Sequence, residues 1–166
     1  MDCCCSGVTT AEVSSQTDYC DCGEPGRIVA KQTVVHQLKN KKLPLVSDEE
    51  YRFCNSRDCD VVYYTRSGEN FTVADLRELV TSKAEGDVRP LCYCFDFTEG
   101  DIRDEIAQRG ETSIPAQVTQ FVKEKLCACE IRNPAGSCCL GEINKTVKRL
   151  AVQVAVQANK EEESYG

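Results

Sequence analysis

The chain has 166 residues, 41% of them hydrophobic, so it is long enough to bury one core or to form two small modules. Its formal net charge of -7 and the lack of a basic stripe argue against a nucleic-acid partner. Because no apolar run reaches the ~20 residues that a membrane-spanning helix needs, membrane insertion is not expected.

The first part of the chain, residues 19–81, is predicted to be a small β module. Three of its segments are rich in β-branched and aromatic residues, which is typical of strands: 27–35, 61–64 and 71–73. Ser67 and Gly68 separate the last two segments and predict a turn between them.

The pattern becomes helical after a polar segment, residues 82–89, which is predicted to be a linker. The first helix is expected between Thr98, which begins a capping-box pattern, and Gly110. A second helix is expected from about Ser113 and a third just after Gly136, each with an apolar stripe at helical spacing.

Thirteen cysteines, mostly in close pairs, are the most informative feature of the sequence. Two thiolates a few residues apart can bind one soft metal ion, whereas neighbouring cysteines are poorly placed to bridge each other. Disulfides are also disfavoured by the odd number of cysteines and by an N-terminus without the basic and apolar regions of an export signal. We therefore expect a metalloprotein in a reducing cytoplasm.

The β part contributes two of these pairs, Cys20 with Cys22 and Cys54 with Cys59. Pairs on loops of adjoining hairpins supply four soft ligands that can converge on one ion, as in the structural site of a zinc ribbon.

The single residue between Cys20 and Cys22 leaves alternatives open, because it is a short gap for chelating one ion. Either both bind through a wider loop, or one ligand comes from the leading cysteines of the chain. His36 is a further candidate ligand, although a lone histidine in a strand is more often a surface or core residue.

The helical part contributes a second set of cysteines. Cys92 and Cys94 precede its first helix, Cys129 follows the second, and Cys138 and Cys139 lie at the start of the third. Helix N-termini favour anionic thiolates and a negatively charged cluster, so these positions suit an iron-sulfur centre. A second structural zinc is the alternative, and the spacing leaves both open.

Three motifs carry a resemblance to a known family: FCNSRDCDVVYY, then CYCFDFTEGDI, then CEIRNPAGSCC. In this order they resemble the N-terminal domain of the copper chaperone CopZ family over residues 19–150. The last two also resemble the 2Fe-2S module of the bacterioferritin-associated-ferredoxin type. The resemblance implies one zinc ion and one 2Fe-2S cluster in this domain.

The resemblance also assigns ligands residue by residue. Its implied zinc ligands are Cys20, Cys22, Cys54 and Cys59, although the family usually has two residues inside the first pair where this chain has one. Its implied cluster ligands are Cys92, Cys94, Cys129 and Cys139, with Cys138 as the substitute for Cys139. Cys127 has no counterpart and is expected to be a bystander.

The expected fold class is therefore α+β, with a small zinc-ribbon-like β module followed by a three-helix 2Fe-2S module. The expected domains are a flexible cysteine-rich N-terminus at 1–18, the zinc module at 19–81, the cluster module at 90–158 and a polar tail at 159–166. Two separate modules also predict that loss of zinc unfolds the first and leaves the second largely intact.

Copper handling is implied by the resemblance, with metal ions as cargo and a copper-transporting ATPase or a redox protein as partner. The family's copper-binding CxxC loop does not occur in this sequence. Cys3, Cys4 and Cys5 are a candidate soft-metal claw for Cu(I), and adventitious thiols in a tail are an equal alternative.

The expected function is that of a cytoplasmic zinc- and 2Fe-2S-binding redox protein in copper or other soft-metal handling, including reduction of Cu(II) to Cu(I). The alternative is a ferredoxin-like electron carrier with no role in metal transfer. A third hypothesis is an interaction module whose metals are all structural. A catalytic role is not expected, because the chain has one histidine and no phosphate-binding or nucleophile motif.

Overall fold

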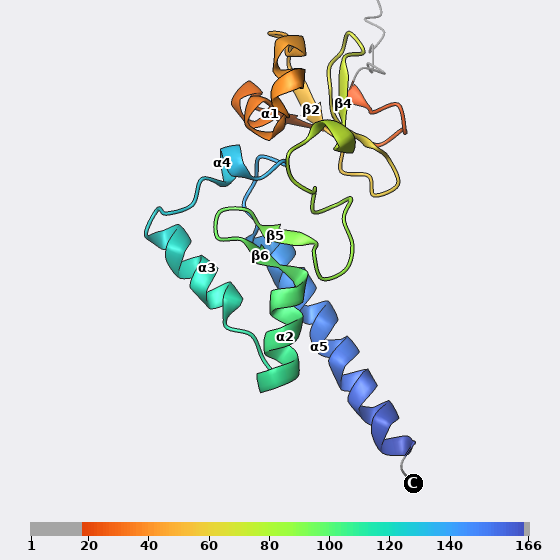
Figure 1. The fold of residues 1–166 in the computed structure, drawn as a ribbon, viewed down its shortest axis with the longest axis vertical. Coiled ribbons are helices and arrows are strands. Elements are labelled where there is room, and N and C mark those ends of the chain that lie inside the picture. The colour runs from red at the N-terminus through yellow and green to blue at the C-terminus, as the bar shows by residue number, and fades with distance from the viewer. Residues whose placement is uncertain (1–17, 165–166) are drawn as a thin grey trace, which may run out of the picture.

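The computed structural model describes residues 18–164, which form two parts joined end to end (Figure 1). The first part is a four-stranded antiparallel sheet in the order β1-β2-β3-β4 with a helix packed on it. Its strands are β1 Arg27–Val29, β2 Tyr51–Phe53, β3 Val61–Tyr64 and β4 Asn70–Thr72. The mixed composition and the small antiparallel sheet confirm the coarse α+β expectation.

The segment 27–35, expected to be one strand, is a strand only to Val29 and continues as helix α1, Lys31–Gln37. The prediction was wrong because the β-branched residues hid a helical pattern. In α1 the buried positions are Thr33, Val34 and Gln37, while Val35 is exposed. Burial at positions 33, 34 and 37 follows the helical period, whereas a strand would bury alternate residues.

The core of the first part lies between α1 and the sheet. Its buried side chains are Val29, Val34, Leu38, Tyr51, Phe53, Val62, Tyr63, Phe71, Leu76 and Val80. Two short 3-10 helices, η2 (Asn40–Leu45) and η3 (Val73–Asp75), complete this part. Gly68 has a φ of 93° in the turn between β3 and β4, a conformation that favours glycine and agrees with the predicted turn.

The second part begins with a short hairpin and continues with helices. Its elements are β5 Pro90–Cys92, β6 Phe97–Thr98, α2 Glu99–Arg109, α3 Ile114–Lys123, α4 Cys129–Arg132 and α5 Leu140–Glu163. The C-terminal half of α5 extends beyond the other helices (Figure 1). No helix within residues 18–164 combines the length and the apolar character needed to span a membrane.

The predicted ends of α2 are confirmed. Thr98 and Asp101 form the capping box, and Gly110 ends the helix in the left-handed conformation with a φ of 80°. The third predicted helix starts later than expected, at Leu140 rather than just after Gly136. The β5–β6 hairpin and the single-turn helix α4 were not predicted, since each is too short to show a hydrophobic period.

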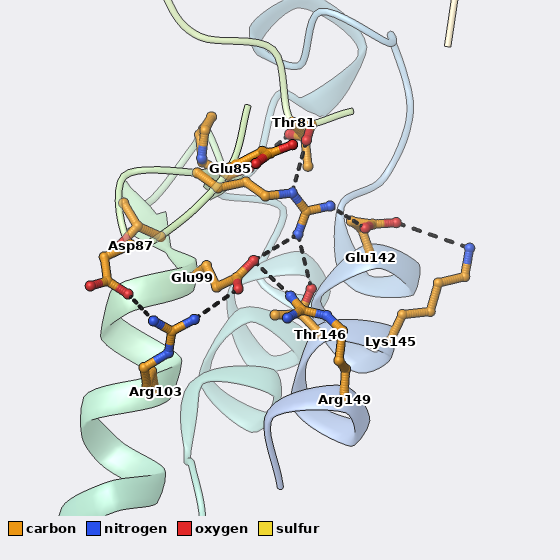
Figure 2. Close-up of polar contacts among 12 residues, drawn as sticks. Thr81, Glu85, Asp87, Glu99, Arg103, Glu142, Lys145, Thr146 and Arg149 are labelled. Carbon is orange, nitrogen blue, oxygen red and sulfur yellow. Dashed lines mark hydrogen bonds and ion pairs between the residues drawn. The ribbon is translucent and has the colours of Figure 1, made fainter. Parts of the chain in front are cut away.

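The segment 82–89, predicted to be a linker, is bonded to its surroundings. Arg89 at its end donates to the backbone oxygen of Thr81 and to the carboxylates of Glu99 and Glu142. Figure 2 shows Glu99 between several guanidinium groups, and its side chain is 5% exposed. This network attaches the connection between the two parts to α2 and α5.

The first part also donates hydrogen bonds to the segment 130–137, which contains most of α4 and part of the connection to α5. The bonds run from Thr33 to the oxygen of Glu130 (2.6 Å), from Gln37 to that of Arg132 (2.7 Å), from Tyr63 to that of Pro134 (2.7 Å) and from Arg27 to that of Ala135 (2.6 Å). Side chains of the sheet and α1 therefore fix the path of this segment and connect the two parts of the chain.

Candidate metal centres

The four cysteines of the first part form one compact group. The sulfurs of Cys20, Cys22, Cys54 and Cys59 all lie within 4.8 Å of one another. Cys20 Sγ is 3.8 Å from Cys59 Sγ, and Cys22 Sγ is 3.7 Å from Cys54 Sγ. A tetrahedral zinc site with Zn–S bonds of about 2.3 Å has sulfur-to-sulfur edges of about 3.8 Å. The donor set therefore fits a tetrahedral zinc ion.

A tight turn brings the closely spaced pair Cys20 and Cys22 to the same point. The N–H of Gly23 donates to the oxygen of Cys20, and Gly23 itself has a φ of 88°. The backbone N–H of Glu24 donates to the Cys22 sulfur and lowers the pKa of Cys22 to about 7. Burial instead raises the pKa of Cys20. The single intervening residue thus permits convergence of both sulfurs.

Lys83 supports the loop that carries the second pair. Its ammonium group donates to the backbone oxygens of Ser56 and Cys59, both at 2.6 Å. Cys54 is fully buried, and burial raises its pKa while the backbone N–H of Ser56 acts in the opposite direction. Sequence reasoning did not identify Lys83, because no local signal relates it to a loop more than twenty residues earlier.

The other candidate ligands for the first centre do not join this group. His36 is exposed on α1 rather than in a strand, and it is not among the four grouped residues. Cys3, Cys4 and Cys5 lie outside the described residues.

The second set of cysteines comes together from three separate segments. Cys92 ends β5, Cys94 lies in the turn of the β5–β6 hairpin, Cys129 begins α4, and Cys139 is the N-cap residue of α5. Cys92, Cys129 and Cys139 are buried in the core of the second part, and Cys94 packs against it.

Contacts between thiols connect these four residues. Cys94 Sγ lies 3.8 Å from Cys129 Sγ, and the Cys139 thiol is within hydrogen-bonding reach of both Cys92 and Cys129. Hydrogen bonding to Cys139 lowers the pKa of Cys129 to about 5 and that of Cys92 to about 7. The same contacts raise the pKa of Cys139. A set of four thiols, mostly buried, has the donor chemistry of a 2Fe-2S centre.

The buried side chain of Tyr93 holds the hairpin next to this set of cysteines. The hydroxyl of Tyr93 donates to the oxygen of Leu79 (2.7 Å) and accepts from the N–H of Thr81 (2.9 Å). Burial raises the pKa of Tyr93 to about 12, so the hydroxyl stays protonated. The backbone N–H of Ala128 donates to Cys94 Sγ at 3.3 Å. Tyr93 therefore fixes the start of the hairpin turn, between Cys92 and Cys94.

Cys138 and Cys139 occupy different environments. Cys139 is 3% exposed and contacts the other thiols, whereas Cys138 is exposed and lines a cavity of about 600 Å³ between the two parts of the chain. The two residues lie just before α5 rather than in its first turn.

Cys127 lies nearer the set than expected for a bystander. Its thiol is within hydrogen-bonding reach of the Cys129 thiol, and its side chain packs against the same core. The second set thus consists of four thiols with a fifth beside it.

Comparisons with known proteins agree with the geometry of the first centre. Residues 19–77 match the CopZ family model described as a zinc binding domain. The chain is 26% identical over 144 residues to the copper chaperone CopZ of Archaeoglobus fulgidus, covering 81% of this chain and 68% of that protein. Its fold is similar to the X-ray structure of the N-terminal domain of A. fulgidus CopZ, with a TM-score of 0.64 and 25% identity, over 76% of this chain and 95% of that domain. Residues 19–77 are therefore similar to the zinc-binding domain of CopZ, and they contain the group of four cysteines that could hold a metal ion.

Proposed function

We propose that this chain is a cytoplasmic zinc- and 2Fe-2S-binding redox protein that handles copper or another soft metal. Zinc bound by Cys20, Cys22, Cys54 and Cys59 has a structural role in the first part. Such a site is closed, because four protein thiolates leave no open position for a substrate. Redox chemistry is therefore assigned to the second set of cysteines.

One observation carries the redox proposal: four thiols from three distant segments meet in the core of the second part. Cys92, Cys129 and Cys139 are each at most 7% exposed, and Cys94 contacts Cys129 at 3.8 Å. Buried thiols that only packed against apolar side chains would not need to converge in this way. A metal centre bound by all four thiols is the simplest reason for the arrangement. The likeness to CopZ over both parts supports the same assignment.

A 2Fe-2S cluster bound by these residues would supply single electrons. The chain itself contributes the groups that tune such a centre, namely N–H donors to sulfur and burial from solvent. The N–H of Ala128 donates to Cys94, and Cys139 sits at the positive N-terminus of α5. Both groups favour the anionic form of the sulfurs.

Copper is proposed as the cargo, in line with the copper chaperone to which the chain is similar. Reduction of Cu(II) to Cu(I) takes one electron per ion and produces the form that thiolates bind best. We propose Cys3, Cys4 and Cys5 as the Cu(I) claw and a copper-transporting ATPase or a redox protein as the partner.

A plain electron carrier is the second candidate, and one observation favours it. Within residues 18–164, the cysteines outside the two proposed ligand sets are Cys127 and Cys138, which belong to different segments. The described part of the chain thus offers no further cysteine pair arranged like a CxxC copper loop.

The proposal is tested with protein purified without oxygen, with a Cys92→Ala variant as control. We expect a visible absorption that dithionite bleaches in the original chain and that is lost in the variant. The reduced protein, freed of dithionite, should then convert Cu(II) to Cu(I), detected with a Cu(I)-specific chelator. A bleachable chromophore without copper reduction would favour the electron carrier, and a colourless, iron-free protein would contradict both.

A further inference from the structure

The loop that joins α3 to α4, residues 124–128, places a fifth thiol beside the proposed cluster ligands. Cys127 lies two residues before Cys129, and its side chain packs against the core to which Cys129 belongs. Cys127 and Cys94 are both partly buried and both pack on the core that contains Cys92, Cys129 and Cys139. A cluster of the 2Fe-2S type takes four thiolates, so one thiol at this place is surplus.

The backbone between Cys127 and Cys129 is not helical. Between them, Ala128 has φ −135° and ψ 49°, which keeps this step of the chain outside the helical conformation. Helix α4 begins only at Cys129, and the side chain of Cys127 packs against the same core that contains Cys129. The Cys127 thiol therefore lies beside the proposed ligand set.

We propose that Cys127 is a reserve ligand that can replace Cys129 at the iron-sulfur centre. The inference rests on the proposed function and adds a second ligand set, Cys92, Cys94, Cys127 and Cys139. In the exchange, the Cys127 sulfur forms a bond to iron and gives up its proton, while the bond from iron to the Cys129 sulfur breaks and that sulfur takes up a proton. No electron is transferred, and the number and charge of the thiolates bound to iron stay the same.

The loop can make this adjustment with little loss of packing. Leu126, next to Cys127, is 59% exposed, so a shift of the loop uncovers little additional apolar surface there. Lys125 has a φ of 59°, a conformation that is less favourable for a residue with a side chain than the right-handed one. Cys129, by contrast, is 7% exposed within the core.

The segment on the other side of the centre offers a matched control. Cys92 and Cys94 are also separated by one residue, but both belong to the proposed ligand set. Loss of Cys94 therefore leaves no surplus thiol on its own loop, whereas loss of Cys129 leaves Cys127.

The experiment compares the full chain with Cys129→Ala, Cys94→Ala and the double variant Cys127→Ala/Cys129→Ala, each reconstituted with iron and sulfide without oxygen. Iron per chain, visible absorption and electron paramagnetic resonance of the reduced protein are measured. Cys129→Ala should keep most of its iron and show a shifted resonance. The iron content of the double variant should be lower than that of Cys129→Ala by about tenfold or more. In iron-loaded Cys129→Ala, Cys127 should also resist alkylation. Zinc content of each variant checks that the first part is folded.

Equal iron in Cys129→Ala and the double variant would overturn the inference, and so would alkylation of Cys127 in iron-loaded Cys129→Ala. Equal iron in Cys94→Ala and Cys129→Ala would overturn it as well, because a surplus thiol would then make no difference. Failure of the original chain to bind iron is a distinct result, since it would contradict the proposed function itself.

Discussion

The two cysteine centres differ in how far their sulfurs spread. In the first, all four sulfurs lie within 4.8 Å of one another, close to the edges of a single tetrahedron. In the second, thiols contact each other in pairs, such as Cys94 with Cys129. Among residues 18–164, only the first centre has four sulfurs that all lie within 4.8 Å of one another. A compact set suits one ion, and a wider set suits a centre with two metal ions.

The two centres also differ in what positions their ligands. The first uses two short loops of one sheet, whereas the second uses three segments, one of which is fixed by the first part through Thr33, Gln37 and Tyr63. We therefore expect the second centre to depend on the first more than the first depends on the second. Loss of the first centre should disturb the second, while loss of the second should leave the first largely intact.

The largest expected effect comes from Cys54→Ser, at a fully buried proposed ligand of the first centre. Binding energy at a structural zinc site is also folding energy, so removal of one thiolate should cost several kcal/mol of the ~10–16 kcal/mol available. Zinc per chain and thermal unfolding measure the loss. Iron content should fall as well, because the segment 130–137 loses its hydrogen-bond donors. Unchanged zinc would contradict the ligand assignment, and unchanged iron would restore the expectation of independent modules.

The second prediction separates Cys138 from Cys139. Cys139→Ala should lose the visible chromophore while keeping zinc, because Cys139 contacts both Cys92 and Cys129. Cys138→Ala should keep the chromophore and lose one reactive thiol in an alkylation count, because Cys138 is exposed. A chromophore that survives in both variants would place the fourth ligand elsewhere.

Two tyrosines of β3 test the dependence more finely. Tyr63 donates to the oxygen of Pro134 in the second part, whereas Tyr64 donates to the oxygen of Asp18 within the first. Tyr63→Phe should cost about 1–3 kcal/mol of unfolding free energy, since it leaves a buried carbonyl without this donor. It should also shift the resonance of the second centre, and Tyr64→Phe should not. Identical spectra for the two variants would show that the contact does not tune the centre.

The smallest effect is expected in the network that attaches residues 82–89. Burial alone would raise the pKa of Glu99, but hydrogen bonds and charges from Arg149 and Arg89 lower it below the usual range (Figure 2). Glu99→Gln should therefore cost about 1–2 kcal/mol at pH 7. The contribution of the carboxylate is complete above the ordinary pKa of glutamate and is lost as the pH falls through the lowered value. Urea unfolding of both proteins at pH 7 and at lower pH values measures the difference, and a penalty that grows on acidification would contradict this sign.

Sequence reasoning succeeded where the signals are local. The capping box at Thr98, the glycine stop at Gly110 and the strand of β3 are properties of a few neighbouring residues, and each is confirmed. It failed at α1, because tertiary packing of Val34 and Leu38 outweighed the strand propensity of the segment.

The candidate site shows the same limit. The close cysteine pairs predicted the candidate ligands. The structure brings all four sulfurs of the first set together and places two of the second set, Cys94 and Cys129, in contact. The contacts of Lys83 with the second zinc loop and of Tyr63 with Pro134 join residues that are far apart in the chain. Such contacts leave no periodic signal in the sequence, so no local rule could have predicted them.

We propose that the two centres bind different metals, which can be tested by metal analysis combined with electron paramagnetic resonance. Protein purified without oxygen should contain one zinc ion and two iron ions per chain, and dithionite should produce the resonance of a reduced 2Fe-2S cluster. Cys139→Ala should lose both the iron and the resonance and keep the zinc. Two zinc ions per chain, with no iron and no resonance after reconstitution with iron and sulfide, would contradict the account.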